Sequence, residues 1–125
     1  MNIDPQTFAA AWLAAWNAHD VEAVLSHFHE DAVFTSPFAA LVMPESGGRL
    51  VGKPAIRAYW SAGIARVPDL HFTLDTLFAG VDCLVLAYMN QKGVRVSEVL
   101  KFAGELVIEG HGTYPPGANP VGARA

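Results

Sequence analysis

Charged residues are scarce in this chain of 125 residues and make up only 16% of it. Eight basic residues stand against twelve acidic ones, which gives a net charge of −4 and a pI near 5.6. The basic residues are scattered singly, so no basic stripe exists that could neutralise the phosphates of a nucleic acid. The same scatter argues against a basic patch for a membrane surface. We therefore expect neither nucleic acid nor membrane as a partner.

Cysteine is limited to Cys83, which stands in an apolar run beside Leu84. A single cysteine excludes a disulfide within the chain, and its apolar setting favours a buried, unreactive thiol over a nucleophile. No segment is long and apolar enough to span a bilayer, and residues 1–5 lack a basic region followed by a signal-peptide core. These absences predict a cytoplasmic protein.

Hydrophobic residues, by contrast, make up 52% of the chain, which is enough for a full core plus a lined cavity or a subunit interface. Residues 1–114 are interpreted as one domain, since the sequence shows no internal repeat and no sign of a second domain. Residues 115–125 are rich in Pro, Gly and Ala, which predicts a flexible C-terminal tail.

Helical signals occupy the first half of the chain. Asp4 can cap a helix over residues 5–18, whose apolar residues recur at spacings of three and four. Asp20 can cap a second, short helix over residues 21–28. A third helix is expected over residues 52–66.

Strand signals dominate the second half. A short strand at residues 32–37 is followed by an irregular loop over residues 38–51, which can hold an edge strand at residues 49–51. The four long strands that follow are separated by turns and are expected at residues 70–78, 83–90, 94–102 and 106–114. This order predicts an α+β domain in which three N-terminal helices cover one face of a curved antiparallel sheet and enclose a pocket.

The last two predicted strands bring two carboxylates and a histidine near one another. If Ala103-Gly104 is a two-residue turn, Glu98 faces Glu109, and the same face carries His111. Charged groups set among aliphatic side chains indicate a buried acid/base site, so Glu98, Glu109 and His111 are our candidate catalytic residues. A one-residue bulge would turn Glu109 outward to solvent. Glu98 can alternatively be a buried carboxylate that only shapes the pocket.

Large apolar side chains, together with one serine at a strand end, supply the candidate ligand-binding wall. In a fold of this kind the inner wall of the core is also the wall of the pocket, so the two roles overlap. The candidates are Trp12, Trp16, Phe34, Ser36, Tyr59, Trp60 and Met89.

Metal and cofactor signatures are missing from the sequence. His27 and His29 stand close to Glu30-Asp31, but they lie at a helix end and no further ligand set accompanies them. No glycine-rich loop that could cradle a phosphate is present. We therefore expect neither a metal nor a cofactor.

Four segments resemble the SnoaL-like group of the nuclear-transport-factor-two-like (NTF2-like) superfamily, which includes ketosteroid isomerases and polyketide cyclases. They are WLAAWNAHD at 12–20, FHEDAVFTSP at 28–37, GKPAIRAYW at 52–60 and EVLKF at 98–102. The likeness runs collinearly over nearly all of residues 6–114 and is specific for the fold, whereas this scaffold carries many unrelated activities. It implies a cone-shaped barrel open at one end, and a homodimer formed through the convex face of the sheet.

The resemblance to ketosteroid isomerases can be followed residue by residue. Trp12 stands where that family has its oxyanion-hole tyrosine, Ser36 stands where it has its general-base aspartate, and Glu98 corresponds to its protonated acid on the penultimate strand. Because Trp12 cannot titrate and Ser36 cannot abstract a carbon-bound proton unaided, we do not expect a standard ketosteroid isomerase. Polyketide cyclases of the SnoaL type have their acid/base groups on the last two strands, where this chain has Glu98 and His111.

Two functions follow as hypotheses. The first is a cofactor-independent isomerase or cyclase that transfers a proton on a small hydrophobic carbonyl compound, with Glu98 as acid or base, His111 as its partner and Trp12 as a hydrogen-bond donor. The second is a non-catalytic small-ligand-binding or dimerisation module of the same fold. Epoxide hydrolysis ranks third, because it needs an Asp-Arg-Asp arrangement around a water and the candidate pocket residues contain no aspartate.

Overall fold

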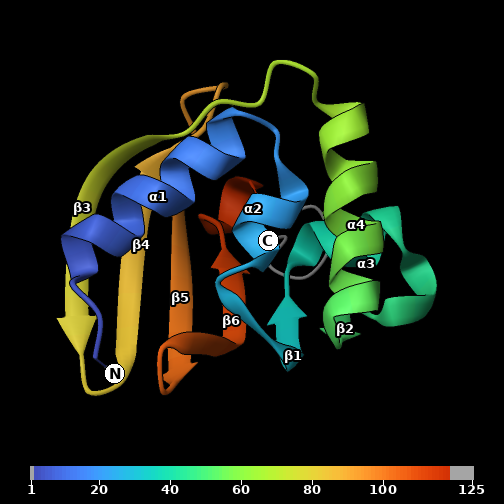
Figure 1. Ribbon diagram of the computed structural model, residues 1–125. Coiled ribbons are helices and arrows are strands. Elements are labelled where there is room, and N and C mark those ends of the chain that lie inside the picture. Colours follow the sequence, from blue (N-terminus) through green and yellow to red (C-terminus); the bar gives the residue numbers. More distant parts are fainter. Residues whose placement is uncertain (1, 119–125) are drawn as a thin grey trace.

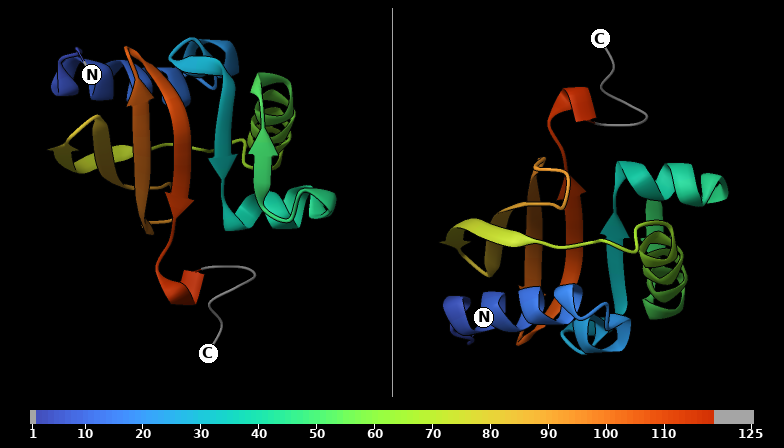
Figure 2. Two further views of the ribbon diagram at one scale, coloured as in Figure 1. Left: turned by 90° about the horizontal axis from the view of Figure 1, so that it is seen from below. Right: turned by 90° about the horizontal axis from the view of Figure 1, so that it is seen from above.

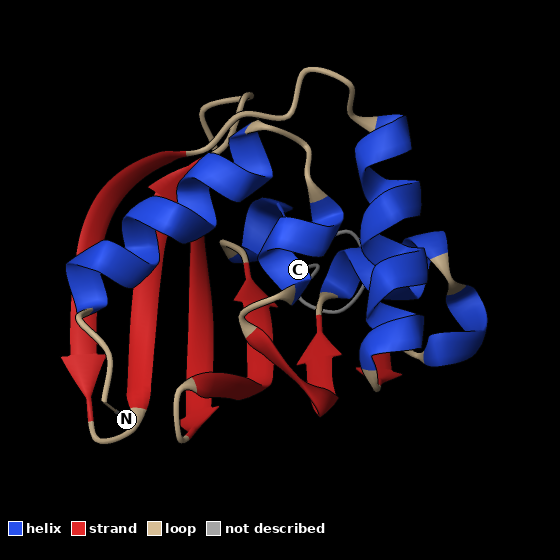
Figure 3. Cartoon of the chain, in the orientation of Figure 1, coloured by secondary structure: helices blue, strands red, loops and turns tan. Residues whose placement is uncertain are grey.

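A computed structural model of the protein describes residues 2–118 (Figures 1 and 3). In chain order its elements are α1 (Pro5–Asn17), α2 (Val21–Leu25), β1 (Phe28–Thr35), α3 (Pro37–Val42), η1 (Pro44–Ser46), β2 (Arg49–Val51), α4 (Lys53–Arg66), β3 (Thr73–Gly80), β4 (Cys83–Met89), β5 (Arg95–Ala103), β6 (Leu106–Thr113) and η2 (Pro116–Ala118), where η denotes a 3-10 helix. None of the helices in this part of the chain has the length and apolar character needed to cross a membrane.

The strands of the described residues form one sheet in the order β2-β1-β6-β5-β4-β3. All neighbouring strands are antiparallel except β1 and β6, which run parallel. The sheet curls, and α1 and α4 lie over its concave side (Figures 1 and 2). The predicted α+β architecture is confirmed, but the sheet is mixed rather than purely antiparallel because β1 joins it beside β6.

Helix α1 begins where the sequence places its cap. The Asp4 carboxylate accepts hydrogen bonds from the Thr7 backbone N–H at 2.9 Å and from the Thr7 hydroxyl at 2.6 Å. Phe8, Trp12 and Trp16 recur every four residues and are buried in the core. The spacing therefore turns one side of the helix toward the concave face of the sheet.

The C-terminal end of α1 is tied to the segment that precedes β3. The Asn17 side-chain amide donates to the Phe72 carbonyl at 3.0 Å, and the Phe72 N–H donates to Asn17 Oδ1 at 2.8 Å. His19 Nε2 lies 2.9 Å from the Leu70 carbonyl oxygen. These contacts hold the Phe72 ring against Tyr88, with ring centroids 4.3 Å apart.

The segment 38–51 is not the irregular loop that the sequence predicts. Its first part belongs to α3, where Pro37 occupies the first turn and the Ser36 hydroxyl accepts a hydrogen bond from the Phe38 N–H at 3.2 Å. The short helix η1 follows, and the edge strand at residues 49–51 is present as β2. The described residues thus contain four α-helices rather than three.

Other boundaries also differ from the prediction. The strand expected at residues 32–37 is β1 (Phe28–Thr35), and the strand expected at residues 70–78 is β3 (Thr73–Gly80). The second helix ends at Leu25 instead of residue 28, because Phe28 pairs with Val107 and starts β1. Of the predicted flexible tail at residues 115–125, only the first residues are described, and η2 forms within them; residues 119–125 lie outside the described part of the chain.

The β5–β6 hairpin has a different register from the predicted one. Its two-residue turn is Gly104-Glu105 rather than Ala103-Gly104, and Gly104 adopts a positive φ of 64°. A bulge at Ile108 then shifts the pairing by one further residue. Because side chains alternate along a strand, this shift decides which residues face the interior beyond the bulge.

Candidate functional site

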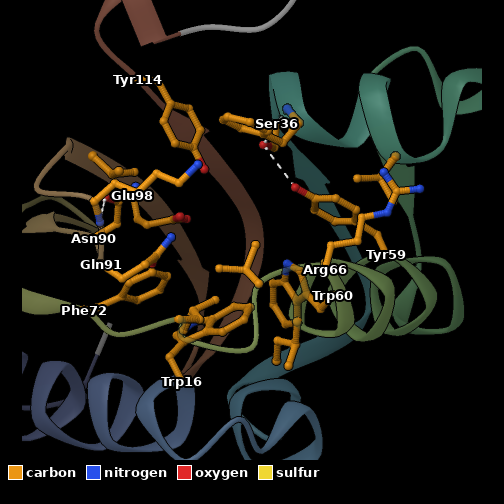
Figure 4. A pocket seen from close by; sticks show the side chains of 18 of the residues that line it. Trp16, Ser36, Tyr59, Trp60, Arg66, Phe72, Asn90, Gln91, Glu98 and Tyr114 are labelled. Atoms are coloured by element: carbon orange, nitrogen blue, oxygen red, sulfur yellow. Dashed lines mark hydrogen bonds between the residues drawn. The ribbon is translucent and has the colours of Figure 1, made fainter.

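A cavity of about 270 Å³ opens between the concave side of the sheet and helices α3 and α4. Figure 4 shows Tyr59 and Trp60 on one side of it, Phe72 and Glu98 on the other, and Trp16 at its base. Aromatic rings form much of the wall; they belong to Trp16, Phe34, Phe38, Tyr59, Trp60, Phe72, Tyr88 and Tyr114. The cavity is therefore suited to a largely apolar molecule.

Glu98 supplies the buried carboxyl group of this cavity. It lies on β5 opposite Gly112, and only 7% of its surface is exposed. The Tyr88 hydroxyl donates a hydrogen bond to Glu98 Oε1 at 3.0 Å. Burial raises the pKa of Glu98 from 4.5 to about 7, and the Tyr88 bond offsets part of that rise. Near neutral pH the group can thus both give and take a proton.

Three further hydroxyl groups turn toward the same space, those of Ser36, Tyr59 and Tyr114 (Figure 4). The Tyr59 hydroxyl donates to Ser36 Oγ at 3.4 Å. Burial raises the pKa of Tyr59 and of Tyr114, and negative charge on Glu98 raises both further. Both phenols therefore stay protonated at neutral pH and remain hydrogen-bond donors.

The predicted meeting of Glu98 with Glu109 and His111 on one face is wrong. The bulge at Ile108 turns Glu109 and His111 to the convex face of the sheet, away from the cavity. There His111 Nε2 lies 2.6 Å from Glu109 Oε2, and His111 Nδ1 lies 2.5 Å from the Thr35 hydroxyl. The bond to His111 lowers the pKa of Glu109. The two residues form their own cluster and do not contact Glu98.

The predicted wall residues divide into two groups. Those that line the cavity are Trp16, Phe34, Ser36, Tyr59 and Trp60. Trp12 and Met89 do not line it, which corrects the prediction. Trp12 is 2% exposed and lies behind Trp16 and Phe72, with ring centroids 6.2 Å and 6.0 Å away. Met89 follows Tyr88 on β4, so strand alternation places it on the convex face.

Sequence reasoning missed four aromatic residues of the wall: Phe38, Phe72, Tyr88 and Tyr114. Tyr88 stands two residues after Leu86, which opposes Glu98, so alternation along β4 could have placed it beside the carboxyl group. The sequence-predicted register put Tyr114 on the face opposite Glu98, and the bulge reverses that assignment. Phe72 precedes β3 and is positioned by Asn17, a contact that no local pattern indicates.

The donor set of the cavity favours proton transfer and hydrogen bonding. One carboxyl group that titrates near neutral pH lies among hydroxyl donors and aromatic rings. Within residues 2–118, His, Cys, Asp and Glu side chains form no group of three or more that could hold a metal ion.

Comparison with protein families and solved structures places the chain in a known family. The sequence model of the SnoaL-like domain family matches residues 9–124. A SnoaL-like protein of unknown function from Burkholderia thailandensis E264 has 37% sequence identity and a TM-score of 0.83, over 89% of this chain and 93% of that chain. A comparison with curated proteins gave no match.

More distant solved structures share the fold alone. TerC co-crystallised with polyporic acid has 14% identity and a TM-score of 0.75, over 92% of this chain and 95% of that chain. An NTF2-like protein of unknown function from Cytophaga hutchinsonii ATCC 33406 has 13% identity and a TM-score of 0.68, over 93% and 94%.

Proposed function

Since the chain belongs to the SnoaL-like domain family of the NTF2-like superfamily, we propose that it binds a small, mainly apolar carbonyl compound in the cavity around Glu98 and transfers a proton on it, as an isomerase or a cyclase does. The family alone does not specify this chemistry, because one scaffold carries many activities. The proposal is therefore argued from the cavity.

The observation that carries the proposal is the state of Glu98. Its carboxyl group is buried, borders an apolar cavity and has a pKa raised to about 7. A general acid or base acts best when its pKa lies near the working pH. The ionised form would remove a proton from the carbon next to a carbonyl group, and the protonated form would return it to another carbon or to oxygen.

The hydroxyl groups around Glu98 would serve the carbonyl oxygen. Removal of the carbon-bound proton moves negative charge onto this oxygen, and donors aimed at it stabilise the charge. Tyr59 and Tyr114 are protonated donors on the opposite and upper sides of the cavity in Figure 4. In this proposal they are the hydrogen-bond donors to the carbonyl oxygen, a role that the sequence hypothesis gave to Trp12, which lies outside the cavity wall.

Carbon–hydrogen exchange offers a direct test. We expect the protein to accelerate the exchange of the protons at C2 of 1-tetralone, a small bicyclic ketone, in D2O, followed by proton NMR. Glu98→Gln keeps the size of the side chain but cannot ionise, so its exchange rate should fall to that of buffer. Glu109→Gln removes a carboxyl group on the convex face and should retain the rate of the unmodified protein. Equal rates with and without protein across a panel of cyclic ketones would reject the catalytic proposal.

Non-catalytic ligand binding is the second candidate function. It is favoured by the position of His111, because the expected acid/base partner of Glu98 lies on the other face of the sheet. TerC, which shares the fold, was co-crystallised with polyporic acid, a precedent for a small-molecule ligand. Native mass spectrometry that finds a retained apolar molecule, together with no exchange activity, would favour this candidate.

A further inference from the structure

Two basic side chains border the cavity, although the protein as a whole is acidic. Arg66 is the last residue of α4, and Lys92 stands in the loop between β4 and β5. Both are exposed, and neither forms an ion pair with an acidic residue in the described part of the chain. Glu98 is the only acidic residue that lines the cavity among the described residues. The opening therefore presents positive charge to an approaching molecule.

Glu98 does not account for these two cations. Burial raises the pKa of Glu98, and the hydrogen bond from Tyr88 offsets part of that rise. The carboxyl group lies deep in the cavity, whereas the cations are exposed at its edge. Figure 4 shows Arg66 on the α4 side of the cavity, and Lys92, from the β4–β5 loop, lines the same cavity. A bound molecule could thus meet positive charge from two sides at the opening.

Two polar atoms in the wall also have no partner among the described residues. They are the indole N–H of Trp16 and the side-chain oxygen of Gln91, both buried. Trp16 is 8% exposed. A buried donor and a buried acceptor without partners are unfavourable. An acceptor oxygen of a ligand would satisfy the Trp16 N–H, and a ligand hydroxyl would satisfy the Gln91 oxygen. The body of the ligand is therefore apolar but oxygenated.

We propose that the ligand of this cavity is a small carboxylate: an apolar, oxygenated ring system whose single negative charge lies between Arg66 and Lys92 and whose carbonyl group reaches toward Glu98. This inference rests on the proposed use of the cavity and adds the class of molecule that fills it. A cavity of about 270 Å³ is just below the usual range of about 300–1,000 Å³ for small-molecule sites, which suits one or two rings.

A carboxylate fits this opening better than a phosphate does. Arg66 stands in the last turn of α4, where the carbonyl end of the helix carries partial negative charge. That end disfavours a dianion, and the lining residues offer no run of glycines whose backbone N–H groups could surround a phosphate. A singly charged, planar group can instead be bound by the Arg66 guanidinium through two parallel hydrogen bonds.

The test compares two tetralones that differ only in charge. One is 5-oxo-5,6,7,8-tetrahydronaphthalene-2-carboxylate, and the other is the corresponding carboxamide, which has nearly the same shape. Binding of each is measured by isothermal titration calorimetry at about pH 7.5. We expect the carboxylate to bind about tenfold more tightly than the carboxamide to the unmodified protein, as one charge-assisted contact would give. Added salt should weaken the binding of the carboxylate and leave the binding of the carboxamide unchanged.

Two variants locate the effect. In Arg66→Met/Lys92→Met the affinity for the carboxamide should stay within about twofold, while the preference for the carboxylate disappears. Lys101→Met removes a base on the outer face of β5 and should keep the full preference. Thermal unfolding of each variant checks the fold.

The outcomes separate this inference from the proposed function. If both tetralones bind the unmodified protein equally, the inference is wrong and the proposed function stands. If the double variant retains the preference, the cations are not the binding site and the inference is wrong. If neither tetralone binds, the proposed use of the cavity fails, and this inference fails with it.

Discussion

Replacement of Glu98 by glutamine should change how the stability of the protein depends on pH. The unmodified side chain ionises in an apolar setting, and its pKa in the folded protein is about 7 compared with an ordinary value of 4.5. The folded state therefore holds this proton more tightly than the unfolded state does. The stabilisation from the protonated group is complete below about pH 4.5 and is lost as the pH rises to about 7.

The size of the effect follows from the two pKa values. Each pH unit between them removes about 1.4 kcal/mol of unfolding free energy, so the whole interval from 4.5 to about 7 removes about 3 kcal/mol. Glutamine has nearly the same volume, can still accept the hydrogen bond from Tyr88 and does not ionise. The unfolding free energy of Glu98→Gln should therefore gain about 3 kcal/mol relative to the unmodified protein between pH 4.5 and pH 8.

Urea unfolding at half-unit steps of pH, at one protein concentration, measures this difference. Glu105→Gln is the matched control, since Glu105 is exposed in the β5–β6 turn and its replacement should leave the pH dependence unchanged. If the curves of Glu98→Gln and the unmodified protein run parallel from pH 4.5 to pH 8, ionised Glu98 is not disfavoured by its surroundings. The argument for an acid/base group in the cavity would then be lost.

Other predictions concern the neighbours of this carboxyl group and the convex face. Tyr88→Phe removes the hydroxyl that lowers the pKa of Glu98, so carbon-13 NMR of labelled Glu98 should show its titration moved to higher pH. Gly110→Ala should lower the free energy of unfolding in urea by about 1–3 kcal/mol, because a methyl group there would lie 3.1 Å from the Phe34 ring and 3.2 Å from the Leu100 side chain. Gly112→Ala, whose methyl group would have its nearest atom at 3.4 Å, should lower it less. Equal losses of unfolding free energy in the two variants would contradict this packing. Val99→Arg places a charge on the convex face, where the family resemblance predicts a homodimer, so sedimentation should show a monomer; an unchanged mass would place the contact elsewhere.

The sequence was sufficient for the parts of the fold that depend on local pattern. The Asp4 cap, the four-residue spacing of Phe8, Trp12 and Trp16, and the alternation along the last four strands each act within a few residues. They predict α1, the meander and the inward direction of Glu98. The family resemblance added the helix–sheet arrangement, which the structure confirms.

The candidate site was harder to predict because its composition depends on one bulge. With Ile108 inside a regular ladder, the pairing set by the Gly104-Glu105 turn would bring His111 opposite Glu98. A single extra residue sends His111 to the other face and brings Tyr114 in. No composition rule marks Ile108 as the position of a bulge, since its side chain suits a regular strand equally well. Arg66 and Lys92 likewise come from segments whose distance in space is set by the whole fold.

The parallel pairing of β1 with β6 has a consequence for how the protein is made. The Val107 N–H donates to the His27 carbonyl at 2.8 Å, so the start of β1 pairs with a segment that is synthesised much later in the domain. The first two strands cannot join the meander until that segment has left the ribosome, because β6 is their only link to it within the sheet. Closure of so long a loop delays assembly, so β1 and β2 should join the sheet late in folding.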